Sequence, residues 1–225
     1  MNFSENAKIQ FLDVSSNQFT GPLPDIPAQV TSIGLSDGIF FNLRHNRFSG
    51  VIPSSWWRAN LGSIDLSNCE MVGKLPDVPP SVVKLVLRGN QFRGPVPASW
   101  LQISALEHLD MSFNAIVGPP FSWGNCGSDL QRGYDPSTYD YRSSEWPLHP
   151  NWSSSLKTLD VSHNPLGIHV GFLVCNVLRY ELLEVFRADS CDLHGHIGWY
   201  DLLWYKPTAG GSITGGNIFN HLHTL

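Results

Sequence analysis

The sequence predicts an α/β solenoid: a right-handed horseshoe with a short parallel inner β-sheet and an irregular or 3-10 convex side. A fixed pattern of apolar residues, asparagine, phenylalanine, glycine and proline recurs along the chain, and its regular copies lie 21 to 24 residues apart. Each copy contains an x-Leu-x-Leu-x segment, whose alternation is typical of a short strand with one buried side. Because a single copy cannot bury its own apolar residues, neighbouring copies must stack and share a core.

One copy, Leu12–Pro24, has the sequence LDVSSNQFTGPLP and is anchored on Asn17. Apolar residues precede the anchor by eight, five and three positions, and an aromatic residue, a glycine and a proline follow it by two, four and seven positions. The strand before the anchor is expected to alternate inward apolar and outward polar side chains. The same frame recurs at seven anchors: Asn17, Asn46, Cys69, Asn90, Asn114, Asn164 and Cys191.

These anchors are expected to form a structural ladder. An Asn side chain holds an acceptor and two donors, so stacked Asn residues can satisfy the turn backbones of neighbouring coils, which lie away from water. Cys69 and Cys191 occupy two rungs. We expect structural, unreactive thiols there, because buried cysteines are usually inert. A second apolar column inside the coils is expected from Phe19, Phe48 and Phe92.

The interval between Asn17 and Asn46 is longer than the regular period and allows two registers. The connector LPDIPAQVTSI closely matches the later connector LPDVPPSVVKL, so we expect Ser32–Leu35 to form the inward strand, with Gly38 at its anchor position. A strand at Phe41–Leu43 is the alternative.

The interval between the anchors Asn114 and Asn164 is also longer than the regular period, and it sets the domain organisation. Residues 124–155 are rich in Gly, Ser, Asp, Pro and Tyr, which predicts a surface-loop insertion. We therefore expect a solenoid over residues 1–198 that carries this insertion. A C-terminal tail is expected over 199–225, partly disordered or a truncated cap.

Composition and motif content exclude several classes of function. The formal net charge is −5 and no basic stripe is present, which argues against nucleic acid as a partner. The apolar runs are too short for a membrane span in this chain. No zinc-like cysteine spacing, Walker A, G-x-S-x-G or H-E-x-x-H motif occurs, so we expect no enzyme activity, no cofactor and no metal site.

The segments LDVSSNQFTGPLP, NLRHNRFSGVIP and VLRGNQFRGPVP resemble the plant-specific class of leucine-rich repeat, whose signature is N-x-F-x-G-x-I-P. That class is found in receptor-like kinases, receptor-like proteins and polygalacturonase-inhibiting proteins. The connectors Pro53–Trp56, Pro97–Trp100 and Pro120–Trp123 are also similar to the P-x-x-W step of repeat-bearing surface antigens of kinetoplastids.

The resemblance implies a non-enzymatic recognition module of a cell-surface or secreted protein, which binds a protein, peptide or glycan on its concave face. Two alternatives are the ectodomain fragment of a receptor-like kinase and an inhibitor of a cell-wall-degrading enzyme. The family's paired-cysteine cap, a signal and an anchor are not found in this chain, so an incomplete array is expected. An extracellular or cell-surface location would make the sequons at Asn2 and Asn151 candidates for glycosylation.

Outward positions of the predicted strands are filled mostly by Asp and Ser, and the departures from that filler are the candidate partner-binding residues. Aromatic residues and arginine contribute most of the binding energy at protein interfaces. The candidates are Phe11, Lys84, Arg88, His108, Phe113, His163 and Arg187.

Two further groups of residues are candidate sites. Asp110 and Asp160 are expected to lie on adjacent strands, where bonding to the nearby serines is favoured over an acid–base pair or a calcium site. Four tryptophans would form either a carbohydrate platform or, as we expect, packing of the convex connectors: Trp56, Trp57, Trp100 and Trp123.

Overall fold

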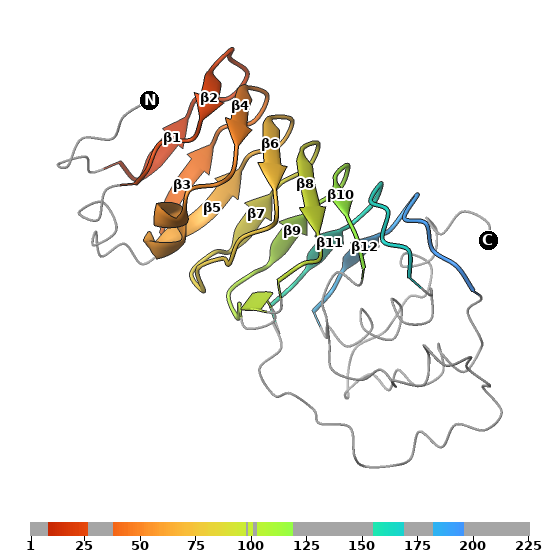
Figure 1. The fold of residues 1–225 in the computed structure, drawn as a ribbon. Coiled ribbons are helices and arrows are strands. Elements are labelled where there is room, and N and C mark those ends of the chain that lie inside the picture. Colours follow the sequence, from red (N-terminus) through yellow and green to blue (C-terminus); the bar gives the residue numbers. More distant parts are fainter. Residues whose placement is uncertain are drawn as a thin grey trace.

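The chain is a solenoid of stacked coils with two parallel sheets, as seen in a computed structural model that describes residues 9–26, 38–97, 99–100, 103–118, 155–168 and 182–195 (Figure 1). The inner sheet has the strand order β1-β3-β5-β7-β9-β11-β12, and all its pairings are parallel. These strands are β1 (Phe11–Asp13), β3 (Ile39–Asn42), β5 (Leu61–Asp65), β7 (Lys84–Val86), β9 (His108–Asp110), β11 (Thr158–Asp160) and β12 (Val185–Arg187). The predicted solenoid with a short parallel inner sheet is confirmed.

A second parallel sheet runs alongside the first and was not predicted. Its strands are β2 (Thr20–Pro22), β4 (Arg47–Gly50), β6 (Glu70–Gly73), β8 (Gln91–Gly94) and β10 (Ala115–Ile116), in the order β10-β8-β6-β4-β2. They follow the anchors, and β4, β6 and β8 each span both the apolar position and the glycine of the repeat. The convex side of the second coil holds the 3-10 helix η2 (Ser54–Arg58).

The core lies between the two sheets and the convex connectors. Phe48 and Phe92 are buried, with 2% and 1% of their surface exposed. The prediction that Phe19 also packs inside was wrong, because its side chain is 42% exposed. Among the described residues only the next coil packs against it, through a stacked contact with Phe48 at 5.9 Å between ring centroids.

The register between the first two anchors differs from the one we favoured. β1 pairs directly with β3, with Leu12 opposite Phe41, so the inward strand is at Ile39–Asn42 and the expectation of Ser32–Leu35 was wrong. Residues 27–37 lie outside the described part. The physical reason is that Phe41 is buried in the core and Asn46 supplies a ladder amide, whereas a glycine anchor at position 38 has no side chain to bond.

The second long interval lies between β9 and β11, which are direct neighbours in the sheet with Leu109 opposite Leu159. Of the predicted insertion over 124–155, only Ser155 is described. The predicted tail over 199–225 lies outside the described residues. Their boundaries therefore stay predictions.

The convex connectors hold two of the tryptophans in the core and join coils in pairs. Trp56 is 1% exposed, and its indole N–H donates to the Pro24 carbonyl oxygen at 2.8 Å, one coil away. Beside it, Ser55 donates a hydrogen bond to Asp25 at 2.7 Å. The same two bonds recur in the fourth coil: Trp100 to Pro76 at 2.7 Å, and Ser99 to Asp77. We call each pair of bonds a latch.

The latches hold the Trp56 and Trp100 side chains inside the convex side. Both pack the convex side, as expected, and neither forms a carbohydrate platform. Trp57 is half-buried, and Trp123 lies outside the described residues. In the part of the chain that is described, no helix is long and apolar enough to cross a membrane.

Candidate binding face

The outward surface of the inner sheet, which we call the concave face, carries side chains in rows that follow the strand register. The row nearest the strand starts is Phe11, Phe40, Ser63, Lys84, His108, Thr158 and Val185. The middle row is Asp13, Asn42, Asp65, Val86, Asp110, Asp160 and Arg187. The residues two positions before the anchors form the third row: Ser15, Arg44, Ser67, Arg88, Ser112, Ser162 and Asp189.

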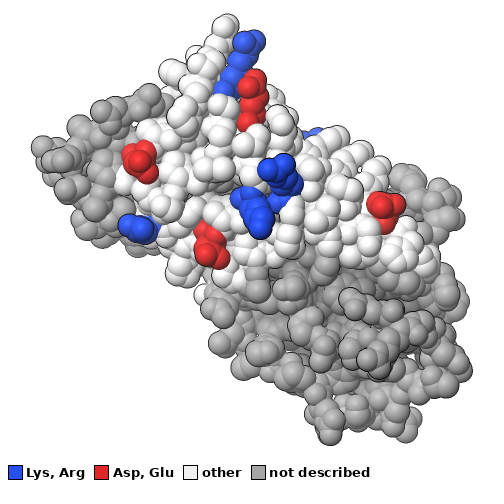
Figure 2. Space-filling view, in the orientation of Figure 1, with Lys and Arg blue, Asp and Glu red and all other residues white. Residues whose placement is uncertain are grey.

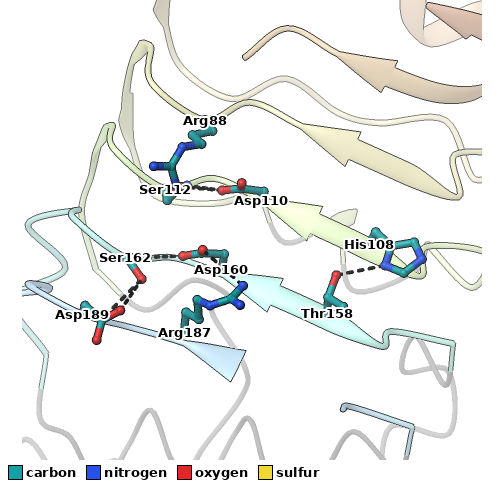
Figure 3. A network of polar contacts seen from close by, with 9 residues as sticks. All are labelled: Arg88, His108, Asp110, Ser112, Thr158, Asp160, Ser162, Arg187 and Asp189. Atoms are coloured by element: carbon teal, nitrogen blue, oxygen red, sulfur yellow. Dashed lines mark hydrogen bonds and ion pairs between the residues drawn. The ribbon is translucent and has the colours of Figure 1, made fainter. Parts of the chain in front are cut away.

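The aspartates of the middle row are bonded within their own coils (Figure 3). Asp110 accepts hydrogen bonds from the backbone N–H and the hydroxyl of Ser112, at 2.9 and 2.6 Å. Asp65 accepts the corresponding pair from Ser67 at the same two distances. Asp160 accepts from the Ser162 N–H at 3.0 Å. Carboxylates bonded in this way are held by the fold and are poor candidates for proton transfer.

The first coil follows the same pattern. Hydrogen bonds from Ser15, with a smaller contribution from Asn42, hold the pKa of Asp13 below its ordinary value. Asp110 and Asp160 face each other in register, yet no group of three His, Cys, Asp or Glu side chains suited to a metal ion occurs within the described ranges.

Three of the predicted binding residues come together in one stack. The Phe113 ring lies between the guanidinium of Arg88, 4.3 Å from its centroid, and the His163 ring, whose centroid is 3.9 Å away at an interplanar angle of 23°. Arg88 also donates to the Ser112 hydroxyl oxygen at 2.9 Å, which fixes its orientation. Phe113 remains 42% exposed. We call these residues the Phe113 stack.

The backbone places the stack at the edge of the concave face. Phe113 and His163 both have φ of 56°, in the left-handed region that bulky side chains rarely adopt. The same conformation occurs one position before other anchors, at Ser16, His45, Asn68 and Ser190. The turn therefore imposes this geometry on each described coil, and among these coils it presents stacked aromatic rings only at Phe113 and His163.

The other predicted residues lie apart from the stack. Lys84 is exposed, and His108 contacts Thr158 through Nδ1 at 3.0 Å. Arg187 is half-exposed, with Nη1 3.9 Å from an Asp160 carboxylate oxygen. Phe11 is 68% exposed at the far end of the sheet.

Sequence reasoning missed one concave residue in its final set. Phe40 is 39% exposed and lies opposite Phe11, so the two form an exposed aromatic pair. Phe40 belongs to the alternative register, in which the segment directly before Asn46 is the inward strand, and choosing that register would have selected it.

A further ion pair lies at the start of β9 and β11. Lys157 donates to the Glu107 carboxylate at 2.7 Å. This hydrogen bond lowers the pKa of Glu107 and raises the pKa of Lys157. The pair links the two coils on either side of the long interval.

The ladder positions are bonded unequally. The Asn90 amide oxygen accepts from the Met71 N–H at 3.0 Å, and its NH2 group donates to Leu66, Leu87 and Arg88 carbonyl oxygens at 2.8, 3.0 and 3.3 Å. Asn46, Asn114 and Asn164 each make the equivalent four bonds, two to their own coil and two to the preceding coil. Asn17 is exposed, and among the described residues it makes only two such bonds, to carbonyls of its own coil.

The two cysteine rungs donate weakly to the same kind of carbonyl. The Cys69 thiol lies 3.5 Å from the Leu43 oxygen, and the Cys191 thiol lies 3.2 Å from the Val161 oxygen. Burial raises the pKa of the Cys69 thiol, and it raises the pKa of Cys191 to about 11. Both groups are therefore thiols rather than thiolates near neutral pH.

Alkylation should reveal this protection. We expect iodoacetamide at pH 8 to modify Cys69 and Cys191 roughly a hundredfold more slowly in the native protein than in urea, because the reactive thiolate is scarce and buried. Mass spectrometry of the separated peptides measures each site independently of the other two cysteines. Equal rates in the native and unfolded states would refute the structural role of these thiols.

Comparison with known proteins places these features in a family. A family model described as Leucine Rich Repeat matches residues 8–29 and 39–59, and a second leucine-rich-repeat model matches residues 153–167. Receptor-like protein 54 of Arabidopsis thaliana is 34% identical over 32% of this chain, and receptor-like protein 31 of the same plant is 32% identical over 36% of it. The chain therefore contains leucine-rich repeats, and they are similar to those of plant receptor-like proteins.

The matches cover limited lengths of the relatives. The two aligned segments span 12% and 9% of those receptor-like proteins. The repeats of this leucine-rich-repeat protein superpose on the Arabidopsis receptor kinase HAESA, solved in complex with the peptide hormone IDA and the co-receptor SERK1, with a TM-score of 0.56 and 20% identity over 83% of this chain and 27% of that one.

A plant ice-binding protein superposes with a TM-score of 0.54 and 21% identity, over 83% of this chain and 50% of its own. At these identities the structural likeness shows that the leucine-rich-repeat fold is shared, and no more than that.

Proposed function

We propose that this leucine-rich-repeat protein is a non-enzymatic recognition module that binds a protein or peptide partner on its concave face. The Phe113 stack is the observation that carries the proposal. It presents an aromatic ring, a guanidinium and an imidazole at the surface, on a face where the neighbouring carboxylates are bonded internally. Exposed aromatic and arginine side chains are the groups that dominate binding energy.

The rigidity of the scaffold supports this use. Each inner-sheet strand from β3 to β11 is held on both sides by its neighbours, and the ladder fixes the turns that carry the stack. Side chains that are already ordered lose little conformational entropy on binding, so a larger share of the contact energy appears as affinity.

The proposed class of partner rests on the positions of the aromatic side chains and on the similar proteins. The solved structure of HAESA contains a peptide hormone and a co-receptor, which favours a protein or peptide over a glycan. The buried positions of Trp56 and Trp100 also remove the aromatic platform that a glycan partner would have used. The matches to receptor-like proteins favour a receptor-like ectodomain, at the cell surface or outside the cell, over an inhibitor of wall-degrading enzymes.

A random-peptide display library tests the proposal. We expect selected binders to lose at least tenfold in affinity, about 1.4 kcal/mol, for a variant with Lys84, Arg88, His108 and Phe113 all replaced by alanine. A control variant carries alanine at Arg47, Val72, Gln91 and Arg93, which are exposed on the second sheet. Titration by biolayer interferometry compares the two variants with the parent chain.

Circular dichroism must show that both variants keep the parent's thermal transition. Binders that survive the concave substitutions and are lost with the control variant would refute the proposal, since the second sheet would then be the binding surface.

A further inference from the structure

Strand β7 differs from its neighbours in the middle row of the concave face. Val86 lies in register between Asp65 on β5 and Asp110 on β9, so it replaces the aspartate found on either side. Lys84 and Arg88 occupy the positions two residues before and after it, and side chains two residues apart point to the same side of a strand. Along β7 the concave face therefore presents a cation, an apolar residue and a second cation. None of these three positions carries a carboxylate.

Neither cation forms an ion pair with the described residues. Lys84 is exposed and has no ion-pair or hydrogen-bond partner among them. Within the same part of the chain the Arg88 guanidinium contacts the Ser112 hydroxyl and the Phe113 ring, and the Asp110 carboxylate is reached only through that hydroxyl.

Other cations of the inner sheet have carboxylates beside them. Lys157 is bonded to Glu107 at 2.7 Å, and Arg187 lies 3.9 Å from Asp160. Conversely, Asp65 and Asp110, which flank Val86, each accept two hydrogen bonds from their own serines. The β7 segment therefore presents two cations without an ion pair, one at each end (Figure 3 shows the Arg88 end).

Charged side chains are few on the face drawn in Figure 2, and they are of both signs. Between the two cations of β7 the surface is apolar, because Val86 is partly exposed and the exposed Phe113 ring adjoins Arg88.

We propose that β7 binds an extended peptide segment with an acidic, an apolar and a second acidic side chain at alternate positions, matched to Lys84, Val86 and Arg88. This inference rests on the proposed function and specifies the chemistry of its ligand. An extended peptide and a β-strand share the two-residue side-chain period and a rise of about 3.3 Å per residue, so three side chains of each can meet over about 13 Å. The acidic groups neutralise the two unpaired cations, and the central side chain covers Val86 and the edge of Phe113.

Capped synthetic peptides provide the probe. The test peptide is acetyl-Gly-Ser-Glu-Ser-Phe-Ser-Glu-Ser-Gly-amide, labelled with an uncharged dye and followed by fluorescence anisotropy. Two controls are an isomer with adjacent glutamates and a version with both glutamates replaced by lysine. We expect the test peptide to bind at least fivefold more tightly than the isomer, and to weaken as NaCl rises from about 50 to about 300 mM because the charges are screened.

Charge reversal gives the sharper readout. In the double variant Lys84→Glu and Arg88→Glu we expect at least a tenfold loss for the glutamate peptide and a matching gain for the lysine peptide. A second variant, Val86→Asp, restores the residue found in the neighbouring coils and is expected to weaken the glutamate peptide several-fold without loss of stability. Thermal unfolding followed by circular dichroism checks that each variant is folded.

The outcomes separate this inference from the function on which it rests. If library binders need the concave face but the glutamate peptide does not bind, or binds the charge-reversed variant equally well, the inference is wrong and the proposed function stands. If no library binder depends on the concave face, the proposed function itself fails.

Discussion

Replacement of Trp56 by alanine is expected to lower the free energy of unfolding by about 4 kcal/mol. The side chain is 1% exposed, contacts Phe41 edge-on at 5.2 Å between ring centroids, and donates its indole N–H to the Pro24 carbonyl. The substitution leaves a cavity between two coils and removes one bond of a latch. Urea unfolding followed by circular dichroism measures the change.

The neighbouring tryptophan provides a matched control. The buried indole nitrogen of Trp57 has no hydrogen-bond partner in the structure, so Trp57→Phe removes an unsatisfied donor. We expect this variant to stay within about 0.5 kcal/mol of the parent, whereas Trp56→Phe loses a satisfied bond and about 1 to 2 kcal/mol. Equal losses at the two positions would show that the latch contributes nothing to stability.

The second large effect is expected at the ladder. Asn90→Ala should cost about 3 kcal/mol, because it removes four hydrogen bonds and leaves the Met71 N–H and the Leu66 oxygen without their partner in the core. For a domain of this size that is roughly 6 to 12 °C in melting temperature. Differential scanning calorimetry of the purified chain is the measurement.

Two variants sharpen the test. Asn17→Ala is expected to cost less than about 1 kcal/mol, because Asn17 is exposed and bonds only within its own coil. Asn90→Cys copies the rung at Cys69 and should lose less than alanine, since the thiol can still donate to a carbonyl. A loss at Asn17 as large as the loss at Asn90 would contradict the inter-coil role of the ladder.

The repeat period was enough to predict the solenoid and its inner sheet, because the apolar spacing before each anchor specifies which side chains enter the core. It did not specify the register before Asn46. There, the similarity of two connectors favoured Ser32–Leu35, whereas Phe41, packed against Trp56 in the core, occupies the strand. The second sheet was missed because strands such as Ala115–Ile116 are too short to show an alternating pattern.

The candidate site was predictable residue by residue but not as a cluster. Arg88, Phe113 and His163 stood out because they replace the usual Asp and Ser filler. Their stacking depends on the left-handed turns and on the side chains chosen by each coil, which separate positions along the sequence do not specify. Val86 drew no interest in the sequence, since its meaning comes from the aspartates that the register places on both sides.

The latches also bear on how such an array can change in length. They join the first described coil to the second and the third to the fourth, through donors at Trp56 and Trp100 and acceptors at Pro24 and Pro76. Removal of the third coil alone would set Trp100 against the second-coil connector, where the Pro53 oxygen already accepts the Trp56 backbone N–H at 3.1 Å and Ser54 stands in place of Asp77. Removal of the second and third coils together would bring Trp100 to the Pro24 connector and reconstitute the bond. We therefore expect the described coils to tolerate duplication and deletion best in units of two, about twice the period of the sequence repeat.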